Sequence, residues 1–376
     1  MINADSVVVV DEITTASKDY KIGRLTLNKP KALNALDLEM AGIMLDALRQ
    51  WQARSDIVAV VIDAAGEKAF CAGGDIVSMY NSMVEAHGEI PAFLETFFET
   101  EYTLDYTIHN YDKPIIVWGS GIVMGGGMGL LCGASHRVVT ETSRLAMPEI
   151  SIGLYPDVGG SYFLPRLPGK SGLFLGLTGG QMNAADAMYV GLADVMVSSA
   201  EKENLLQGLV DYAWNETSSS TLAEAVNTVL SRLQKPETEV QSNIEPNMPL
   251  INELCSANNV SEVVNAILTA DMQGDKWLSR AQSTLAKGSP ITMHLVFEQC
   301  KKGATMSLAD CFRMEADMSC RCGESGEFQE GVRALLIDKD MTPQWKFKKV
   351  EDVPEAEIAH FFTSPWSKEA HPLAAL

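Results

Sequence analysis

The sequence predicts an α/β layered fold followed by a helical C-terminal region. In the first half of the chain, short β-branched runs alternate with helical patterns, an arrangement typical of α/β layers. After about residue 204 the strand-like runs give way to Glu and Leu at helical spacing. These two observations predict an α/β core at 1–200 and a helical region at 201–376.

Two strands, a helix and a buried strand are expected first. The runs 7–10 and 23–27 are rich in Val, Leu and Thr, and we expect them to pair. Asp37 precedes apolar residues at helical spacing and is the expected N-cap of a helix. The run 57–62 contains no polar residue, which predicts a buried strand.

The middle of the chain continues the alternation. A helical stretch is expected over 76–109, followed by strands at 115–118 and 137–140. The apolar segment 114–134 is long enough to suggest a membrane span, but its seven glycines favour a strand, a turn and a helix start.

The C-terminal region is expected to be helical with one long loop. The segment 234–249 is rich in Pro, Asn, Glu and Ser, which favours a surface loop. Helix stops are expected at 288–290 and at Gly323. Helical patterns cover 205–229, 258–268 and 277–336.

Two glycine-rich turns each follow a strand and open a helix. Gly73 and Gly74 form the first, and the triple 125–127 forms the second. A helix N-terminus carries unpaired N–H groups and a partial positive charge, and glycine lets a ligand oxygen approach the backbone closely. Two such turns facing each other would form an oxyanion hole for a thioester carbonyl. Close packing is the alternative explanation for either turn taken alone.

Two acidic residues follow these turns in apolar surroundings rich in Gly and Pro. Glu149 comes after Met147 and Pro148, and Asp157 precedes Val158. Partial desolvation would raise the pKa of each carboxyl and suit it to proton transfer. A solvent-facing position is the alternative for either acid taken alone.

A dinucleotide-binding motif is nearly present but incomplete. Gly119 and Gly121 follow a strand, but Met124 stands where the third glycine of G-x-G-x-x-G belongs. Its side chain would obstruct the close helix–strand contact that the motif requires. The sequence therefore disfavours a nicotinamide cofactor.

These motifs, in this order, resemble the crotonase superfamily, also called the enoyl-CoA hydratase/isomerase superfamily. The resemblance implies a crotonase-like ββα spiral core and an acyl-CoA substrate. The resemblance extends over nearly the whole chain through an acid within 153–160, the segment 163–167 and motifs between 288 and 345. They point to a branch that hydrolyses a 3-hydroxyacyl-CoA thioester in valine breakdown. The motifs that carry the resemblance in the core are 28–36, 69–76, 121–129 and 146–153.

The resemblance assigns roles to individual residues. Gly74 and Gly126 match the two oxyanion-hole amide donors, and Glu149 matches the acid shared by many members. Asp157 matches the second acid of the hydrolase branch, where it would contact the 3-hydroxyl or help to place water. Residues matching the family's substrate and CoA contacts are Lys31, Ala32, Leu33, Ala72, Gly73, Asp75 and Gly125.

The resemblance also shows an informative departure. Hydratases of the family carry a second glutamate where this chain has Gly129, so hydratase activity is not expected. Thioester hydrolysis is expected instead, with Glu149 as general base on water or as nucleophile through a mixed anhydride. An enoyl-CoA isomerase, which needs one carboxylate, and a protein that binds acyl-CoA without chemistry are the alternatives.

No metal, flavin or nicotinamide is required, and CoA enters only as part of the substrate. The six histidines show no ligand spacing. The net charge of −20 argues against nucleic-acid binding, although some crotonase relatives bind RNA. Members often form trimers or paired trimers, so the resemblance suggests a homo-oligomer.

A cytoplasmic protein with no membrane association is expected. The seven cysteines are interpreted as reduced, and the first ten residues lack the basic region of a signal or transit peptide.

Overall fold

The computed structural model describes residues 5–214 and 218–376. The chain divides into two compact units. Unit 1 comprises the chain up to Gly74, Leu104–Leu145 and Met182–Ser242, and unit 2 comprises Asp75–Thr103, Ala146–Gln181 and Asn243–Leu376. These units group segments that are distant in the chain, whereas the predicted division into 1–200 and 201–376 follows chain order. Residues 1–4, on which part of the expected localisation rests, lie outside the described residues.

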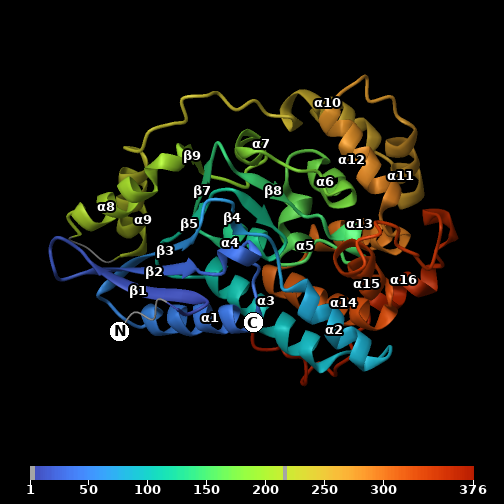
Figure 1. The fold of residues 1–376 in the computed structure, drawn as a ribbon, viewed down its shortest axis with the longest axis horizontal. Coiled ribbons are helices and arrows are strands. Elements are labelled where there is room, and N and C mark those ends of the chain that lie inside the picture. The colour runs from blue at the N-terminus through green and yellow to red at the C-terminus, as the bar shows by residue number, and fades with distance from the viewer. Residues whose placement is uncertain (1–4, 215–217) are drawn as a thin grey trace. The chain divides into compact units, whose positions relative to one another are not determined.

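Unit 1 is built on a six-stranded sheet in the order β1-β2-β3-β5-β7-β9 (Figure 1). β1 pairs antiparallel with β2, and the remaining neighbours are parallel. Every residue of β3 is buried, as a strand covered on both faces requires. The predicted strands are confirmed. Their bounds are Val8–Thr14 (β1), Lys21–Leu27 (β2), Ile57–Ala64 (β3), Ile115–Gly119 (β5) and His136–Thr140 (β7). The sixth strand, β9 (Val195–Val197), was not predicted from the sequence.

Helices α8 and α9 pack on this sheet. Leu205 and Val226 join Val58, Ile116 and Val138 in one buried cluster. The helical pattern predicted at 205–229 is therefore confirmed as two helices of unit 1, with residues 215–217 outside the described part. The helices of unit 1 are α1 (Leu38–Gln52), α4 (Gly126–Gly133), α7 (Ala184–Tyr189), α8 (Lys202–Asp211) and α9 (Ser219–Leu230), with short 3-10 turns at Pro30–Ala32 (η1) and Ser199–Glu201 (η4).

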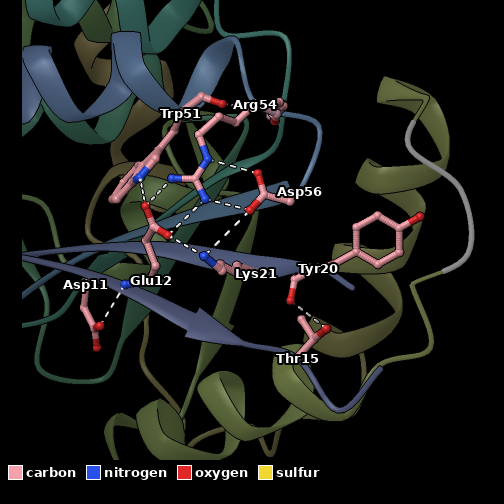
Figure 2. Close-up of polar contacts among 9 residues, drawn as sticks. Asp11, Glu12, Thr15, Tyr20, Lys21, Trp51, Arg54 and Asp56 are labelled. Carbon is pink, nitrogen blue, oxygen red and sulfur yellow. Dashed lines mark hydrogen bonds and ion pairs between the residues drawn. The ribbon is translucent and has the colours of Figure 1, made fainter. Parts of the chain in front are cut away.

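The start of α1 and the β1–β2 hairpin are fixed by charged groups. Asp37 accepts a hydrogen bond from the Met40 amide, so the predicted N-cap is confirmed. On β1, Glu12 accepts hydrogen bonds from Lys21 Nζ at 2.9 Å, from Trp51 Nε1 at 3.1 Å and from Arg54 (Figure 2). The Arg54 hydrogen bond lowers the pKa of Glu12 to about 2, so the hairpin is tied to the end of α1 at neutral pH.

A second, three-stranded sheet carries the glycine-rich turns. Its order is β4-β6-β8, with bounds Ala69–Cys71, Ile122–Met124 and Arg144–Ala146. β4 leads into Gly73 and Gly74, and β6 leads into Gly125 and α4. Each predicted strand–turn–helix arrangement is confirmed. The segment 114–134 accordingly forms β5, β6 and α4, and no helix in the described residues is long and apolar enough to cross a membrane.

Unit 2 is mainly helical. It contains α2 (Ile76–Ala86), η2 (Glu149–Ile152), α5 (Gly160–Phe163), η3 (Leu164–Arg166) and α6 (Ser171–Thr178). The division between the units falls within α3 (Ala92–His109). The C-terminal elements are α10 (Ile244–Leu254), α11 (Val260–Thr269), α12 (Lys276–Lys287), α13 (Pro290–Gly303), α14 (Leu308–Ser325), α15 (Glu327–Val332), the π-helix η5 (Arg333–Ile337), η6 (Val350–Asp352) and α16 (Glu355–Phe361).

Three predicted boundaries are wrong. The expected helix at 76–109 is two helices, because His87 and Gly88 both adopt positive φ and turn the chain. The predicted loop at 234–249 ends early, since α10 begins at Ile244 despite Pro249. Its apolar residues recur at helical spacing and are buried, which outweighs the proline signal. The apolar residues are Ile244, Met248, Ile251 and Leu254.

The predicted helix stop at Gly323 is also wrong. α14 continues to Ser325, and Gly326 with φ +83° ends it. A Cβ atom at Gly323 would lie 2.5 Å from the Leu94 side chain. The glycine therefore serves close packing inside the helix, whereas the predicted stop at 288–290 is confirmed by the end of α12 and the start of α13.

Candidate active site

The first glycine turn of unit 1 reverses the chain after β4. Gly73 has φ +110°, which favours glycine, and the next peptide group carries the Gly74 amide. The Leu36 amide donates to the Gly73 carbonyl at 2.8 Å, and the Ala72 amide donates to the Leu33 carbonyl at 3.1 Å. These bonds fix the orientation of the turn.

The segment that holds this turn is the one predicted to meet CoA. Asn34 is buried, and its side chain donates to the carbonyls of Ala65 and Ala69 at 3.0 and 2.9 Å. Lys31 and Ala32 are exposed. The hydrogen bond between their backbones brings Leu33 and Ala72 together, and the contact of these residues with CoA stays a prediction.

The second glycine turn lies beside the first. Gly125 has φ +47° and precedes Gly126, the first residue of α4. A Cβ atom at Gly127 would lie 2.5 Å from the Cys71 carbonyl oxygen, and one at Gly73 would lie 3.7 Å from the Met124 carbonyl oxygen. Close packing thus explains why residue 127 is glycine. It does not explain the orientation of the neighbouring Gly126 amide.

The amides of Gly74 and Gly126 are not used in the backbone hydrogen-bond network of the described residues. Among the hydrogen bonds of the described residues, neither amide has an acceptor, although Gly126 is buried. A buried donor without a partner costs about 1–3 kcal/mol. Two amide donors without an acceptor, on adjacent turns, are the arrangement that stabilises an oxyanion.

In unit 2, Glu149 is a buried acid with a free oxygen. It begins η2 directly after Pro148 and is 4% exposed. Its Oε2 atom has no hydrogen-bond partner among the described residues. Burial, and secondarily the charge of Asp157, raises the pKa of Glu149 well above its usual range.

Asp157 is equally buried but is hydrogen-bonded. The Tyr102 hydroxyl donates to Asp157 Oδ2 at 2.7 Å. Burial raises the pKa of Asp157 to about 6, against the lowering effect of the Tyr102 hydrogen bond. The predicted desolvation of both acids is confirmed, and the solvent-facing alternative is wrong. Because Tyr102 favours the charged form of Asp157, this acid ionises before Glu149.

The C-terminal helices hold the loop that carries Asp157. Glu315 on α14 accepts hydrogen bonds from the Gly159 and Ser161 amides, both at 2.8 Å. Gln299 on α13 donates to the Pro156 carbonyl at 2.7 Å. Val158 has φ +51°, a costly conformation for a β-branched residue that persists only where the surroundings enforce it.

Glycines let neighbouring elements pack closely on η2. A Cβ atom at Gly288 would lie 2.5 Å from Ile150 Cγ1. A Cβ atom at Gly153 would overlap the Glu327 carbonyl, and one at Gly331 would overlap the backbone of Ile152. The position of Glu149 therefore depends on α15 and on the turn before α13.

Sequence reasoning missed the residues that support the acids. Tyr102 and Ser319 gave no signal, because one is an aromatic residue in an apolar helix and the other a serine in a helix interior. Glu315 belonged to a motif but received no role. Gly129 is a buried glycine of α4 and provides no carboxylate, so Glu149 and Asp157 remain the two acids of the predicted site. Asp75 caps α2 by accepting from the Ser78 amide at 3.2 Å.

Comparison with known proteins gives consistent matches. A sequence model described as enoyl-CoA hydratase/isomerase matches residues 22–362. A protein of Danio rerio named 3-hydroxyisobutyryl-CoA hydrolase, mitochondrial, is 41% identical over 344 residues, which are 92% of this chain and 87% of the relative. The Homo sapiens protein of the same name is 35% identical, covering 92% of this chain and 87% of the relative.

Two solved structures share the fold over nearly their full length. An enoyl-CoA hydratase from Rhodobacter sphaeroides 2.4.1 has a TM-score of 0.82 and 33% identity, covering 96% of this chain and 98% of that one. A carnitinyl-CoA dehydratase from Mycobacterium thermoresistibile has a TM-score of 0.82 and 32% identity, covering 96% and 97%. The predicted crotonase-like core with C-terminal helices is confirmed.

Proposed function

The chain belongs to the enoyl-CoA hydratase/isomerase family, and from this premise we propose that it hydrolyses 3-hydroxyisobutyryl-CoA to 3-hydroxyisobutyrate and CoA. The relatives named 3-hydroxyisobutyryl-CoA hydrolase support this substrate. The observation that carries the proposal is the pair of buried acids, Glu149 and Asp157, which differ in hydrogen bonding. One acid has a free oxygen for chemistry, and the other is held in place for recognition.

The thioester carbonyl oxygen binds the amides of Gly74 and Gly126. Negative charge develops on this oxygen as the carbonyl carbon is attacked, and fixed donors stabilise it without reorganisation. Each donor contributes about 3 kcal/mol to the transition state. CoA lies along the backbone of Lys31, Ala32, Leu33 and Ala72, beside Gly73, Asp75 and Gly125.

Glu149 acts on the thioester in one of two ways. As general base, it takes a proton from water while the water oxygen attacks the carbonyl carbon. As nucleophile, its carboxylate forms a mixed anhydride that water then cleaves. In both routes the C–S bond breaks and the CoA sulfur leaves as a thiolate that takes up a proton. Its raised pKa makes ionised Glu149 a strong base in this site.

Asp157 accepts a hydrogen bond from the 3-hydroxyl of the acyl group. Its pKa of about 6 leaves it anionic at neutral pH, and an anionic acceptor binds a hydroxyl more strongly than a neutral one does. This contact favours a hydroxylated acyl chain over a plain one.

A hydratase or isomerase is the second candidate, because the solved structures above are named as a hydratase and a dehydratase. Water addition across a double bond in this family uses a second glutamate, and Gly129 occupies that position. Hydrolysis is therefore the better-supported activity.

The cellular setting is also part of the proposal. The products place the enzyme in valine breakdown, and the absence of a disulfide among the seven cysteines of the described residues supports a reducing compartment. We place it in the cytoplasm, while its relatives are named mitochondrial. Fractionation of cells that express the tagged chain tests this placement. A homo-oligomer, trimer or hexamer, is proposed from the family alone and is tested by analytical ultracentrifugation.

Replacing Glu149 tests the chemical role directly. Glu149→Gln keeps the shape of the side chain but removes the base and nucleophile, so we expect acyl-CoA affinity within a few-fold of wild type and a loss of kcat of about 1,000-fold or more. Isothermal titration calorimetry and thiol release measure the two quantities. Glu298→Gln, at a weakly paired surface acid, is the matched control and should keep full activity. Retention of most activity by Glu149→Gln would contradict the assignment.

A further inference from the structure

Tyr102 lies at the centre of a buried hydrogen-bond network in unit 2. Its hydroxyl is 2.7 Å from Asp157 Oδ2 and 2.7 Å from Ser319 Oγ. The Tyr155 hydroxyl donates to the Glu315 carbonyl at 2.7 Å and lies 2.8 Å from the same Ser319 Oγ. Because an ionised carboxylate only accepts, Tyr102 gives its single hydrogen to Asp157.

Aromatic packing fixes the Tyr102 ring. The side chain is fully buried, and its ring centroid lies 5.4 Å from that of Phe98 and 5.7 Å from that of Phe312. Phe312 also packs at Gly159, where a Cβ atom would lie 3.4 Å from the ring. The hydroxyl of Tyr102 is therefore held toward Asp157.

One face of α14 supports both the side chain and the backbone of Asp157. Phe312, Glu315 and Ser319 lie three and four residues apart, which places them on the same face of the helix. Phe312 packs on Tyr102, Ser319 contacts its hydroxyl, and Glu315 fixes the backbone after Asp157. The carboxyl group therefore has little freedom to rotate or to withdraw.

Asp157 interacts electrostatically with acids, phenols and a thiol. These groups are Tyr102 on α3, Glu149 on η2, Tyr155 beside it, and Glu315 and Cys322 on α14, and none of them becomes positively charged. Asp157 also takes part in no ion pair of the described part of the chain. Its negative charge is therefore stabilised mainly by hydrogen bonding from Tyr102.

We propose that Tyr102 is a positioning residue that holds Asp157 anionic and oriented, and that Tyr102, with Ser319 behind it, thereby sets the preference for a 3-hydroxylated acyl group. The proposal rests on the proposed thioester hydrolysis. Tyr102 itself makes no contact with the thioester and acts only through Asp157. Its loss therefore weakens recognition of the hydroxyl while the oxyanion donors and Glu149 stay in place.

The test compares two thioesters that differ only in the hydroxyl, 3-hydroxyisobutyryl-CoA and isobutyryl-CoA. In Tyr102→Phe, we expect the ratio of their kcat/KM values to fall by about 10- to 100-fold, the range for a lost hydrogen bond to a charged group. Turnover of isobutyryl-CoA should stay within about threefold. The acid limb of the pH profile for the hydroxylated substrate should move to higher pH by about one unit, because the neutral form of Asp157 is then favoured.

Two further variants make the result decisive. Tyr155→Phe removes a phenol of the same network that donates to the Glu315 carbonyl and not to Asp157. We therefore expect it to keep both the ratio of the two kcat/KM values and the position of the acid limb. Ser319→Ala leaves the Tyr102 bond to Asp157 intact but unsupported, and should give a smaller loss of the ratio in the same direction. It also provides the test if Tyr102→Phe does not fold.

If kcat/KM fell equally for both substrates in Tyr102→Phe or Ser319→Ala, and the acid limb did not move, the positioning role would be overturned. Thioester hydrolysis would still stand. Failure of the proposed function looks different, because the wild-type chain would then release no thiol from either substrate.

Discussion

At the residue scale, burial of the two acids of unit 2 costs free energy, because their ionised forms lose contact with water. Glu149 and Asp157 are each 4% exposed, and removing a charge from water destabilises the ionised form. The hydrogen bond from Tyr102 offsets part of this cost at Asp157, whereas Glu149 Oε2 accepts no hydrogen bond among the described residues that would offset it. A fold that keeps such buried acids gives up stability at this position.

The cost at Asp157 predicts a stabilising substitution that depends on pH. The pKa of Asp157 is raised from 3.8 to about 6 in the folded chain, so the folded state binds the proton more tightly than the unfolded state does. Stability from this group is complete below about pH 4 and is lost as the pH rises through about 6. Asp157→Asn should therefore raise the free energy of unfolding by about 2 kcal/mol at pH 8 and by almost nothing at pH 4.

Chemical denaturation at the two pH values measures this difference, and Asp310→Asn provides a matched control at an exposed acid whose pKa is lowered. A gain of equal size at pH 4 and pH 8 would show that the charge of Asp157 carries no penalty.

At the element scale, local signals predicted the strands and turns well, and tertiary contacts explain two of the three wrong boundaries. The Asp37 cap and the two glycine turns depend on residues within a few positions, so the sequence was sufficient for them. The glycine at position 323 inside α14 is explained by close packing on Leu94, a residue more than two hundred positions away. The buried face of α10 similarly outweighed its prolines, and neither effect could be read from neighbouring residues.

Glycines in two helices should respond to alanine in opposite directions. Gly331→Ala places a Cβ atom against the backbone of Ile152 in η2, so we expect a loss of about 1–3 kcal/mol in unfolding free energy together with reduced turnover. Gly42→Ala, in α1 with nothing within 4 Å, should instead gain about 0.5–1 kcal/mol with unchanged turnover. Thermal denaturation and thiol release test both variants. A stable and active Gly331→Ala would mean that α15 does not determine the position of Glu149.

At the scale of the whole molecule, the predictable part of the site was the part close in the chain. Glu149 and Asp157 are eight residues apart, and each glycine turn is a single short motif, so neighbouring residues were enough to propose all four positions as candidates. The groups that prepare Asp157 come from Tyr102, Gln299, Glu315 and Ser319, which only the folding of unit 2 brings together. The C-terminal helices thus contribute residues that support Asp157, and a motif search over the core alone does not find them.

The most direct test of the account is CoA release measured with a colorimetric thiol reagent, using 3-hydroxyisobutyryl-CoA beside acetyl-, isobutyryl- and crotonyl-CoA. We expect fast thiol release from the 3-hydroxylated thioester, slow release from the others and an unchanged crotonyl absorbance. Loss of the crotonyl absorbance without thiol release from any substrate would contradict it, and would show that the chain adds water to a double bond despite Gly129.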